Sequence, residues 1–308
     1  MARTLIRRVF RRLGFATLLV LLVSSSALVL ARLAPGDTTD AFDARTPEQI
    51  AEDRRRLGLD LPLHEVYGQW LARLIRLDLG TSLKYQRPVS ELVGERSANT
   101  ALLASTALAL ATVVGLPLGV FTASRRRGLI PPLVRAGSVA ALSAPPLLTS
   151  LALVLLAART GWLPIGGIGT VWHLVIPALA LALPAMGTLE RLQAGALSET
   201  LHERFMVAAV ARGVPDRSLL WRHAFRASLA PVLGVYAIIV ASLFSGSFAV
   251  EIVTSWPGLG RLMFDALIAR DIHLVAGCAV AGSCFLAAGS LAADAALAWA
   301  DPRTGEAS

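Results

Sequence analysis

Residues 101–123 read ALLASTALALATVVGLPLGVFTA, a run that contains no charged side chain. An α-helix rises about 1.5 Å per residue and the hydrocarbon core of a bilayer is about 30 Å thick, so about 20 apolar residues suffice to cross it. Residues 101–123 meet that requirement. The run therefore predicts a membrane-spanning α-helix.

Five further apolar runs approach or reach the same length. One of them, Val171–Leu189, contains Pro177 and Pro184, which neighbouring helices can accommodate inside a membrane. The five runs are Leu13–Ala31, Ala136–Ala158, Val171–Leu189, Leu229–Val250 and Leu274–Ala293. We therefore expect an all-α, polytopic membrane protein with six transmembrane helices.

The composition of the whole chain agrees with this fold class. Of 308 residues, 55% are hydrophobic and 16% are charged, whereas soluble domains carry about 25% charged residues. A water-soluble protein could not bury so large an apolar fraction, and a disordered chain would not contain it. Two cysteines are too few for a disulfide-stabilised scaffold.

The first run has two interpretations. Arg7, Arg8, Arg11 and Arg12 precede it, as basic residues precede a secretory signal. However, the run is longer than a typical cleavable core, and more spans follow it. These features favour an uncleaved first transmembrane helix.

The arginines indicate the orientation, because short cytoplasmic loops of membrane proteins carry an excess of positive charge. The net charge is +8, and Lys84 is the only lysine. If six spans alternate, the arginine-rich connections share one side, which predicts that this side and both termini are cytoplasmic. These arginines are Arg3, Arg7, Arg8, Arg11, Arg12, Arg125, Arg126, Arg127, Arg135, Arg191, Arg204, Arg212, Arg217, Arg222 and Arg226. Nucleic-acid binding is the weaker interpretation, since no binding motif accompanies the charge.

The long segment after the first run predicts a small helical extracytoplasmic subdomain. Residues 47–53 (PEQIAED) read as a helix start, and residues 61–71 (LPLHEVYGQWL) as a second, amphipathic piece. The predicted organisation is a tail with the first helix (1–34), the subdomain (35–98), a transmembrane core (99–300) and a cytoplasmic tail (301–308).

The sequence carries no recognisable signature of catalysis or of ATP binding. A phosphate-binding G-x-x-x-x-G-K-[ST] loop needs a lysine after glycine, whereas Lys84 follows Leu83. The five histidines show no metal-ligand spacing. We expect no catalytic, cofactor-binding or metal-binding residue. The predicted spans are almost free of charge, which disfavours an ion-coupled carrier.

The connection at about 190–228 is too long for a simple turn. Its Ala-rich part favours a helix. Gly213 suits the left-handed position after a helix end, Pro215 stops continuation, and Asp216 can cap the next helix. We expect a helix–turn–helix at the membrane surface, apolar on one side and basic on the other. A lipid-surface loop and a docking site for a partner both fit this pattern.

Residues 190–228 resemble the cytoplasmic "EAA" coupling loop of permeases from bacterial ATP-binding-cassette (ABC) importers. Ala208, Ala209 and Gly213 occupy the positions of its alanine and glycine pattern. The continuation RHAFRASLAP at 222–231 is similar to that of the dipeptide, oligopeptide and nickel branch. The stretch EIVTSWPGLGR at 251–261 resembles the extracytoplasmic turn of that branch. The name-giving acidic position of that loop is Val207 here, so this sequence departs from the pattern and offers no acidic side chain at that position.

The resemblance implies a type I importer permease subunit of the inner membrane. Its partners would be a second permease subunit, two cytoplasmic ATPases and an extracytoplasmic substrate-binding protein. The cargo would be a peptide, or alternatively nickel or another small solute. The residues implied in ATPase coupling are Ala208, Ala209, Gly213, Pro215, Leu220, His223, Phe225 and Arg226. Those implied in the extracytoplasmic turn are Glu251, Trp256, Pro257, Gly258 and Gly260. A stand-alone secondary transporter and a membrane-embedded hydrolase are the alternatives from other classes.

Overall fold

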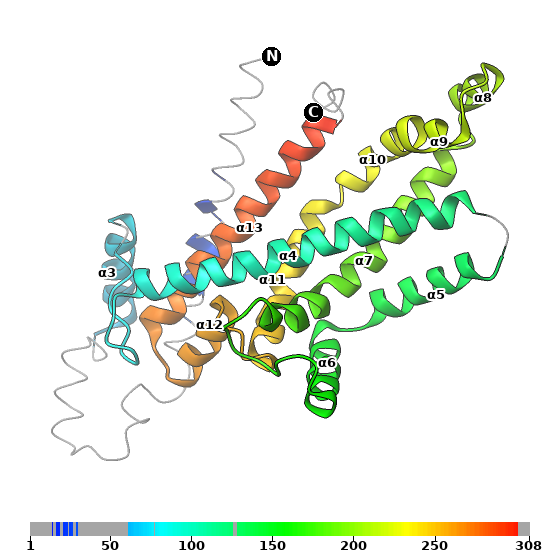
Figure 1. Ribbon diagram of the computed structural model, residues 1–308. Coiled ribbons are helices and arrows are strands. Elements are labelled where there is room, and N and C mark those ends of the chain that lie inside the picture. Colours follow the sequence, from blue (N-terminus) through cyan, green and yellow to red (C-terminus); the bar gives the residue numbers. More distant parts are fainter. Residues whose placement is uncertain are drawn as a thin grey trace. The chain divides into compact units, whose positions relative to one another are not determined.

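The computed structural model describes residues 61–300 except 77, 126 and 127, together with scattered positions between 14 and 29. That part of the chain is helical and contains one isolated bridge, between Thr81 and Pro88. The helices in Figure 1 are α3 (Leu63–Ile75), α4 (Val89–Ser124), α5 (Ile130–Ser143), α6 (Pro146–Thr160), α7 (Trp172–Thr200), α8 (Arg204–Ala211), α9 (Asp216–Ser218), the π-helix η2 (Leu219–Ala224), α10 (Phe225–Leu233), α11 (Tyr236–Val253), α12 (Leu259–Ile268) and α13 (Ile272–Ala300).

Four of these helices are long and apolar enough to cross a membrane, namely α4, α7, α11 and the part of α13 up to residue 292. They contain most of the predicted runs at 101–123, 171–189, 229–250 and 274–293. The all-α, membrane-embedded class is thus confirmed. The predicted first span, Leu13–Ala31, and the helix start at 47–53 lie outside the continuously described residues.

The predicted span Ala136–Ala158 is not one straight helix. It is divided between α5 and α6, which meet at an angle of 105° and form a sharp corner in Figure 1. The cause is Pro145 followed by Pro146, because a residue before proline is driven out of the helical region. Ala144 and Pro145 accordingly have extended backbones, with ψ of 114° and 135°.

The described chain forms two compact units. The first contains residues 61–100 and 257–287, and the second contains residues 101–256 and 288–300. In the second unit α7 is the central helix, since it contacts α5, α6, α10 and α11. Its buried side chains, such as Leu181 and Leu189, join Leu103 of α4 and Leu243 of α11 in one apolar core.

Gly119 allows α4 to approach α7 closely. A Cβ atom at this position would lie 2.7 Å from both the Gln193 Cβ and the Glu190 carbonyl oxygen. Small residues four positions apart, here Gly115 and Gly119, are typical of tightly packed transmembrane helix pairs. The sequence GLPLG at 115–119 therefore fixes where α4 and α7 meet.

Asp271 organises the first unit. Its side chain is buried, and its Oδ2 atom accepts hydrogen bonds from the Ser82 hydroxyl (2.6 Å) and from the backbone amides of Leu83 (2.7 Å) and Lys84 (3.2 Å). Its Oδ1 atom accepts from the Leu274 amide in the first turn of α13 (3.1 Å). One carboxylate therefore caps α13 and holds the loop at 82–84.

Candidate functional site

The predicted coupling loop (190–228) folds as a helix, a turn and a second helical stretch, as expected. It contains the end of α7, then α8, α9, η2 and the start of α10. Gly213 follows α8 with a φ angle of +76°, in the left-handed region where other residues are strained. The Val214 amide bonds back to the Ala209 carbonyl oxygen over 3.3 Å, which closes the end of α8.

Two local expectations for this loop need correction. Asp216 does not cap the next helix, because Pro215 is the N-cap residue and Asp216 is the first helical residue. Residues Leu219–Ala224 form the π-helix η2 rather than an ordinary α-helix. Nothing in the apolar pattern of Leu219 and Leu220 distinguishes a π-turn from an α-turn.

One side of the loop is anchored in an apolar cluster. Met206 of α8 and Leu219 and Ala224 of η2 are buried against Val120 of α4 and Leu197 of α7. Of the predicted coupling residues, Ala209, Leu220 and Phe225 are partly buried against the same cluster. These residues hold the loop on the membrane helices.

Other residues of the loop expose apolar side chains together with arginines. Val207 is 65% exposed and Val210 57%, and Phe205 and Trp221 are also exposed. Ala208, Gly213, Pro215, His223 and Arg226 are exposed as well. The Trp221 and Phe225 rings lie 5.6 Å apart, so the exposed ring rests on the partly buried one. We call Phe205, Val207, Val210 and Trp221 the apolar face of the loop.

Buried polar side chains connect the start of the loop to neighbouring helices. Glu190 on α7 is 1% exposed and its Oε1 atom accepts a 2.5 Å hydrogen bond from the Thr122 hydroxyl on α4. One turn further along α7, the Gln193 amide donates to the Ser228 hydroxyl on α10 over 2.8 Å. Neither contact was predicted from the sequence, because Glu190 and Gln193 both lie beyond the predicted run Val171–Leu189.

The extracytoplasmic turn predicted at 251–261 begins in the second unit. Glu251 lies in the last turn of α11 and is fully buried, although it was expected just beyond the span. Trp256 is 2% exposed and belongs to the apolar core of this unit. Burial of these two side chains favours a packing role within the subunit over direct contact with a partner.

The rest of the turn lies in the first unit, where α4 holds it. The Asn99 side chain donates to the Pro257 carbonyl oxygen (2.8 Å), and the Thr100 hydroxyl accepts from the Leu259 amide (2.7 Å). Gly258 is the N-cap of α12, and Gly260 lies in its first turn. Asn99 and Thr100 thus fix the start of α12 against the first turns of α4, a role that the sequence alone did not indicate.

Comparisons with known proteins cover most of the chain. The family described as "Binding-protein-dependent transport system inner membrane component" matches residues 115–306. A putative peptide transport system permease protein of Brucella abortus is 34% identical over 87% of this chain and 89% of its own length. The oligopeptide transport system permease protein AppB of Bacillus subtilis is 30% identical, over 96% of this chain and 98% of its own length. A probable peptide ABC transporter permease of Sinorhizobium fredii is similar to the same degree over the same shares.

Proposed function

The chain belongs to the family of binding-protein-dependent transport system inner membrane components, and from this premise we propose that it is a permease subunit of an ABC importer for peptides. The names of its relatives support the peptide cargo, because each of them is called a peptide or oligopeptide transport permease. Nickel or another small solute is the alternative cargo within the same branch.

The apolar face of the coupling loop is the observation that carries the coupling role. Val207, Val210 and Trp221 are exposed although other residues of the same loop are anchored in a buried cluster. An exposed apolar patch on an anchored element is typical of a protein–protein contact. The residues proposed to meet the ATPase are the apolar face together with Ala208, Gly213, Pro215, His223 and Arg226.

In this proposal the subunit itself is non-catalytic and moves because its ATPases move. ATP binding would close the ATPase pair, and the anchored loop would pass that movement to α4, α7 and α10. The loop would then lie in the cytoplasm with both termini, and a second, homologous permease would complete the passage. The binding protein would dock on the extracytoplasmic side.

A stand-alone secondary transporter is the second candidate, and one observation favours it. Glu190 and Glu251 lie buried inside α7 and α11, whereas the sequence predicted spans almost free of charge. Ion-coupled carriers place such carboxylates in their spans. The two functions differ in their energy source, so one experiment separates them.

The test is peptide uptake into proteoliposomes that contain this chain, its permease partner and the ATPases, with the binding protein added outside. We expect uptake that needs ATP inside and the binding protein outside, and that persists when ion gradients are collapsed. Uptake by this chain alone, driven by a proton or sodium gradient, would overturn the proposal.

A further inference from the structure

A small cavity lies between α5 and α7 in the second unit. Its volume is about 270 Å³, and its lining combines two arginines, one glutamate and two apolar residues: Arg135, Val139, Glu190, Arg191 and Ala194. Positively and negatively charged residues therefore line the same cavity. The function proposed above uses neither the cavity nor Arg191.

Glu190 lines this cavity, and one of its two carboxylate oxygens has no donor. Its Oε1 atom is bonded to Thr122, but its Oε2 atom is buried without a hydrogen-bond partner in the described part of the chain. A buried carboxylate oxygen without a donor is costly. No described arginine or lysine lies within ion-pair distance of Glu190, so a ligand that carries N–H donors would satisfy the oxygen.

The arginines supply the complementary groups. Arg135 uses one terminal nitrogen to donate to the Thr122 carbonyl oxygen over 2.8 Å, and Arg191 makes no ion pair with the described residues. Guanidinium groups favour phosphate, which they can bind through two parallel hydrogen bonds. The cavity thus offers a place for a phosphate beside a place for an ammonium group.

The position of the cavity along α7 indicates the level of lipid headgroups. Trp172 begins α7 and is exposed, as aromatic residues at a membrane interface are. Arg191 lies 19 residues later, which corresponds to about 28 Å along a helix, close to the thickness of the hydrocarbon core. The cavity is therefore placed at the opposite headgroup layer, on the side of the coupling loop.

We propose that this cavity binds the headgroup of an ethanolamine phospholipid. The phosphate bonds to Arg135 and Arg191, and the ammonium group donates to the Glu190 carboxylate. The acyl chains follow the exposed apolar side chains of α5, beginning at Val139 and Leu142. A glycerol headgroup offers no cation to Glu190, and a choline headgroup offers no N–H donor, so the site distinguishes among lipids with the same phosphate.

The experiment measures lipid retention by native mass spectrometry on the purified, delipidated permease–ATPase complex. Dioleoyl lipids with ethanolamine, choline or glycerol headgroups are added separately. We expect about tenfold preference for the ethanolamine lipid, the size of one hydrogen bond between charged groups. Glu190→Gln should abolish this preference, and Arg191→Gln should weaken retention of all three lipids. Arg159→Gln, an exposed arginine at the end of α6, is the matched control.

Equal retention of the three lipids by the unchanged complex would overturn the proposal, as would no retention at all. An unaltered preference in Glu190→Gln would also overturn it. Arg191 is exposed, so Arg191→Gln keeps the test decisive even if the Glu190 variant fails to fold. The measurement needs only the purified complex and added lipid, so its outcome does not depend on whether the cargo is a peptide.

Discussion

Gln193 on α7 donates a hydrogen bond to Ser228 on α10 over 2.8 Å, and both side chains are buried. Ser228 in turn donates to the Phe225 carbonyl oxygen over 2.9 Å, and Phe225 packs on the cluster that anchors the coupling loop. A membrane helix and the end of the coupling loop are thus joined by a polar contact in an apolar setting. In the proposed function, movement of the loop reaches α7 through this contact.

Ser228→Ala should weaken both stability and coupling. The change leaves the Gln193 amide buried without its partner, which costs about 1–3 kcal/mol. We expect a lower melting temperature of the complex and fewer peptides imported per ATP hydrolysed. Ser242→Ala is the control, since among the described residues Ser242 bonds only to Ile239 of its own helix. Import per ATP equal to that of the control would show that the contact does not transmit coupling.

Gly213→Val should uncouple ATP hydrolysis from import. A Cβ atom at Gly213 would meet nothing within 4 Å, so the effect comes from the φ angle of +76° alone. A β-branched residue there costs about 1–3 kcal/mol and shifts the turn after α8. The rates of hydrolysis and uptake are measured together in proteoliposomes.

Gly213→Asn provides the contrast, because asparagine tolerates the left-handed region. We expect it to import at nearly the rate of the unchanged protein. If the valine variant imports equally well, the assignment of this turn to coupling is wrong.

Val210→Asp should prevent association with the ATPase without unfolding the permease. The side chain is exposed on the apolar face, so the carboxylate stays solvated in the free subunit but would be desolvated at a protein interface. Co-purification with the ATPase is the measurement. Val171→Asp, an exposed valine before α7, should leave co-purification unchanged. Retention of the ATPase by the Val210 variant would move the docking contact elsewhere.

Gly119→Ala should destabilise the pair of helices α4 and α7. The added methyl group would lie 2.7 Å from backbone and side-chain atoms of α7, so the helices must separate at a cost of about 1–3 kcal/mol. Thermal unfolding of the purified subunit checks this. Gly94→Ala on the same helix meets nothing within 4 Å and should not lower the melting temperature.

Asp271→Ala should destabilise the first unit by about 3 kcal/mol or more, because four donors lose a buried carboxylate. The melting temperature of the purified subunit is the measurement.

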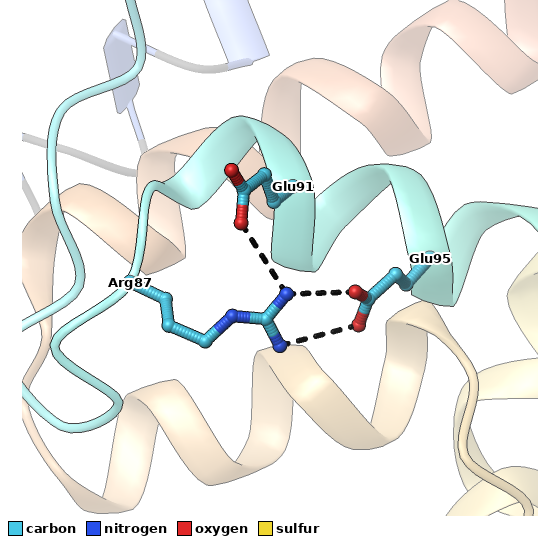
Figure 2. Close-up of polar contacts among 3 residues, drawn as sticks. All are labelled: Arg87, Glu91 and Glu95. Carbon is cyan, nitrogen blue, oxygen red and sulfur yellow. Dashed lines mark hydrogen bonds and ion pairs between the residues drawn. The ribbon is translucent and has the colours of Figure 1, made fainter.

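Arg87→Gln, in contrast, should lower the melting temperature only slightly. Figure 2 shows Arg87 bonded to Glu91 and Glu95. The shortest of these contacts joins Arg87 Nη2 to Glu95 Oε1 over 2.7 Å. All three side chains are exposed, and exposed ion pairs contribute little. A larger loss of melting temperature for Arg87→Gln than for Asp271→Ala would contradict this ranking.

Hydropathy predicted most of the fold because a chain that crosses lipid must form all its backbone hydrogen bonds internally. A long apolar run meets this requirement by forming an α-helix. It failed where local geometry decides. Pro145 and Pro146 break a run that contains no charged residue, and hydropathy alone does not reveal a corner. Glu190 and Glu251 marked the ends of predicted spans, yet the helices continue past them, because a buried carboxylate is tolerated where a partner such as Thr122 bonds to it.

The coupling loop was predictable to a similar extent. Gly213 was placed in the left-handed region from residue type and position, and its φ angle agrees. Asp216 was misplaced by one position, because Pro215 is itself compatible with the extended backbone of an N-cap. The contacts of Gln193 could not be foreseen, since its partner lies 35 residues away on another helix.

The π-helix η2 places more residues in each helical turn between α9 and α10 than an α-helix would. A π-turn closes its hydrogen bonds over five residues rather than four, so Leu219–Ala224 holds more chain per turn than an α-helix requires. Tightening one such turn would release a residue and rotate the flanking helices by about 100° relative to each other. In the proposed function, such a rotation would turn the coupling loop relative to α10 while the connection between α9 and α10 stays helical.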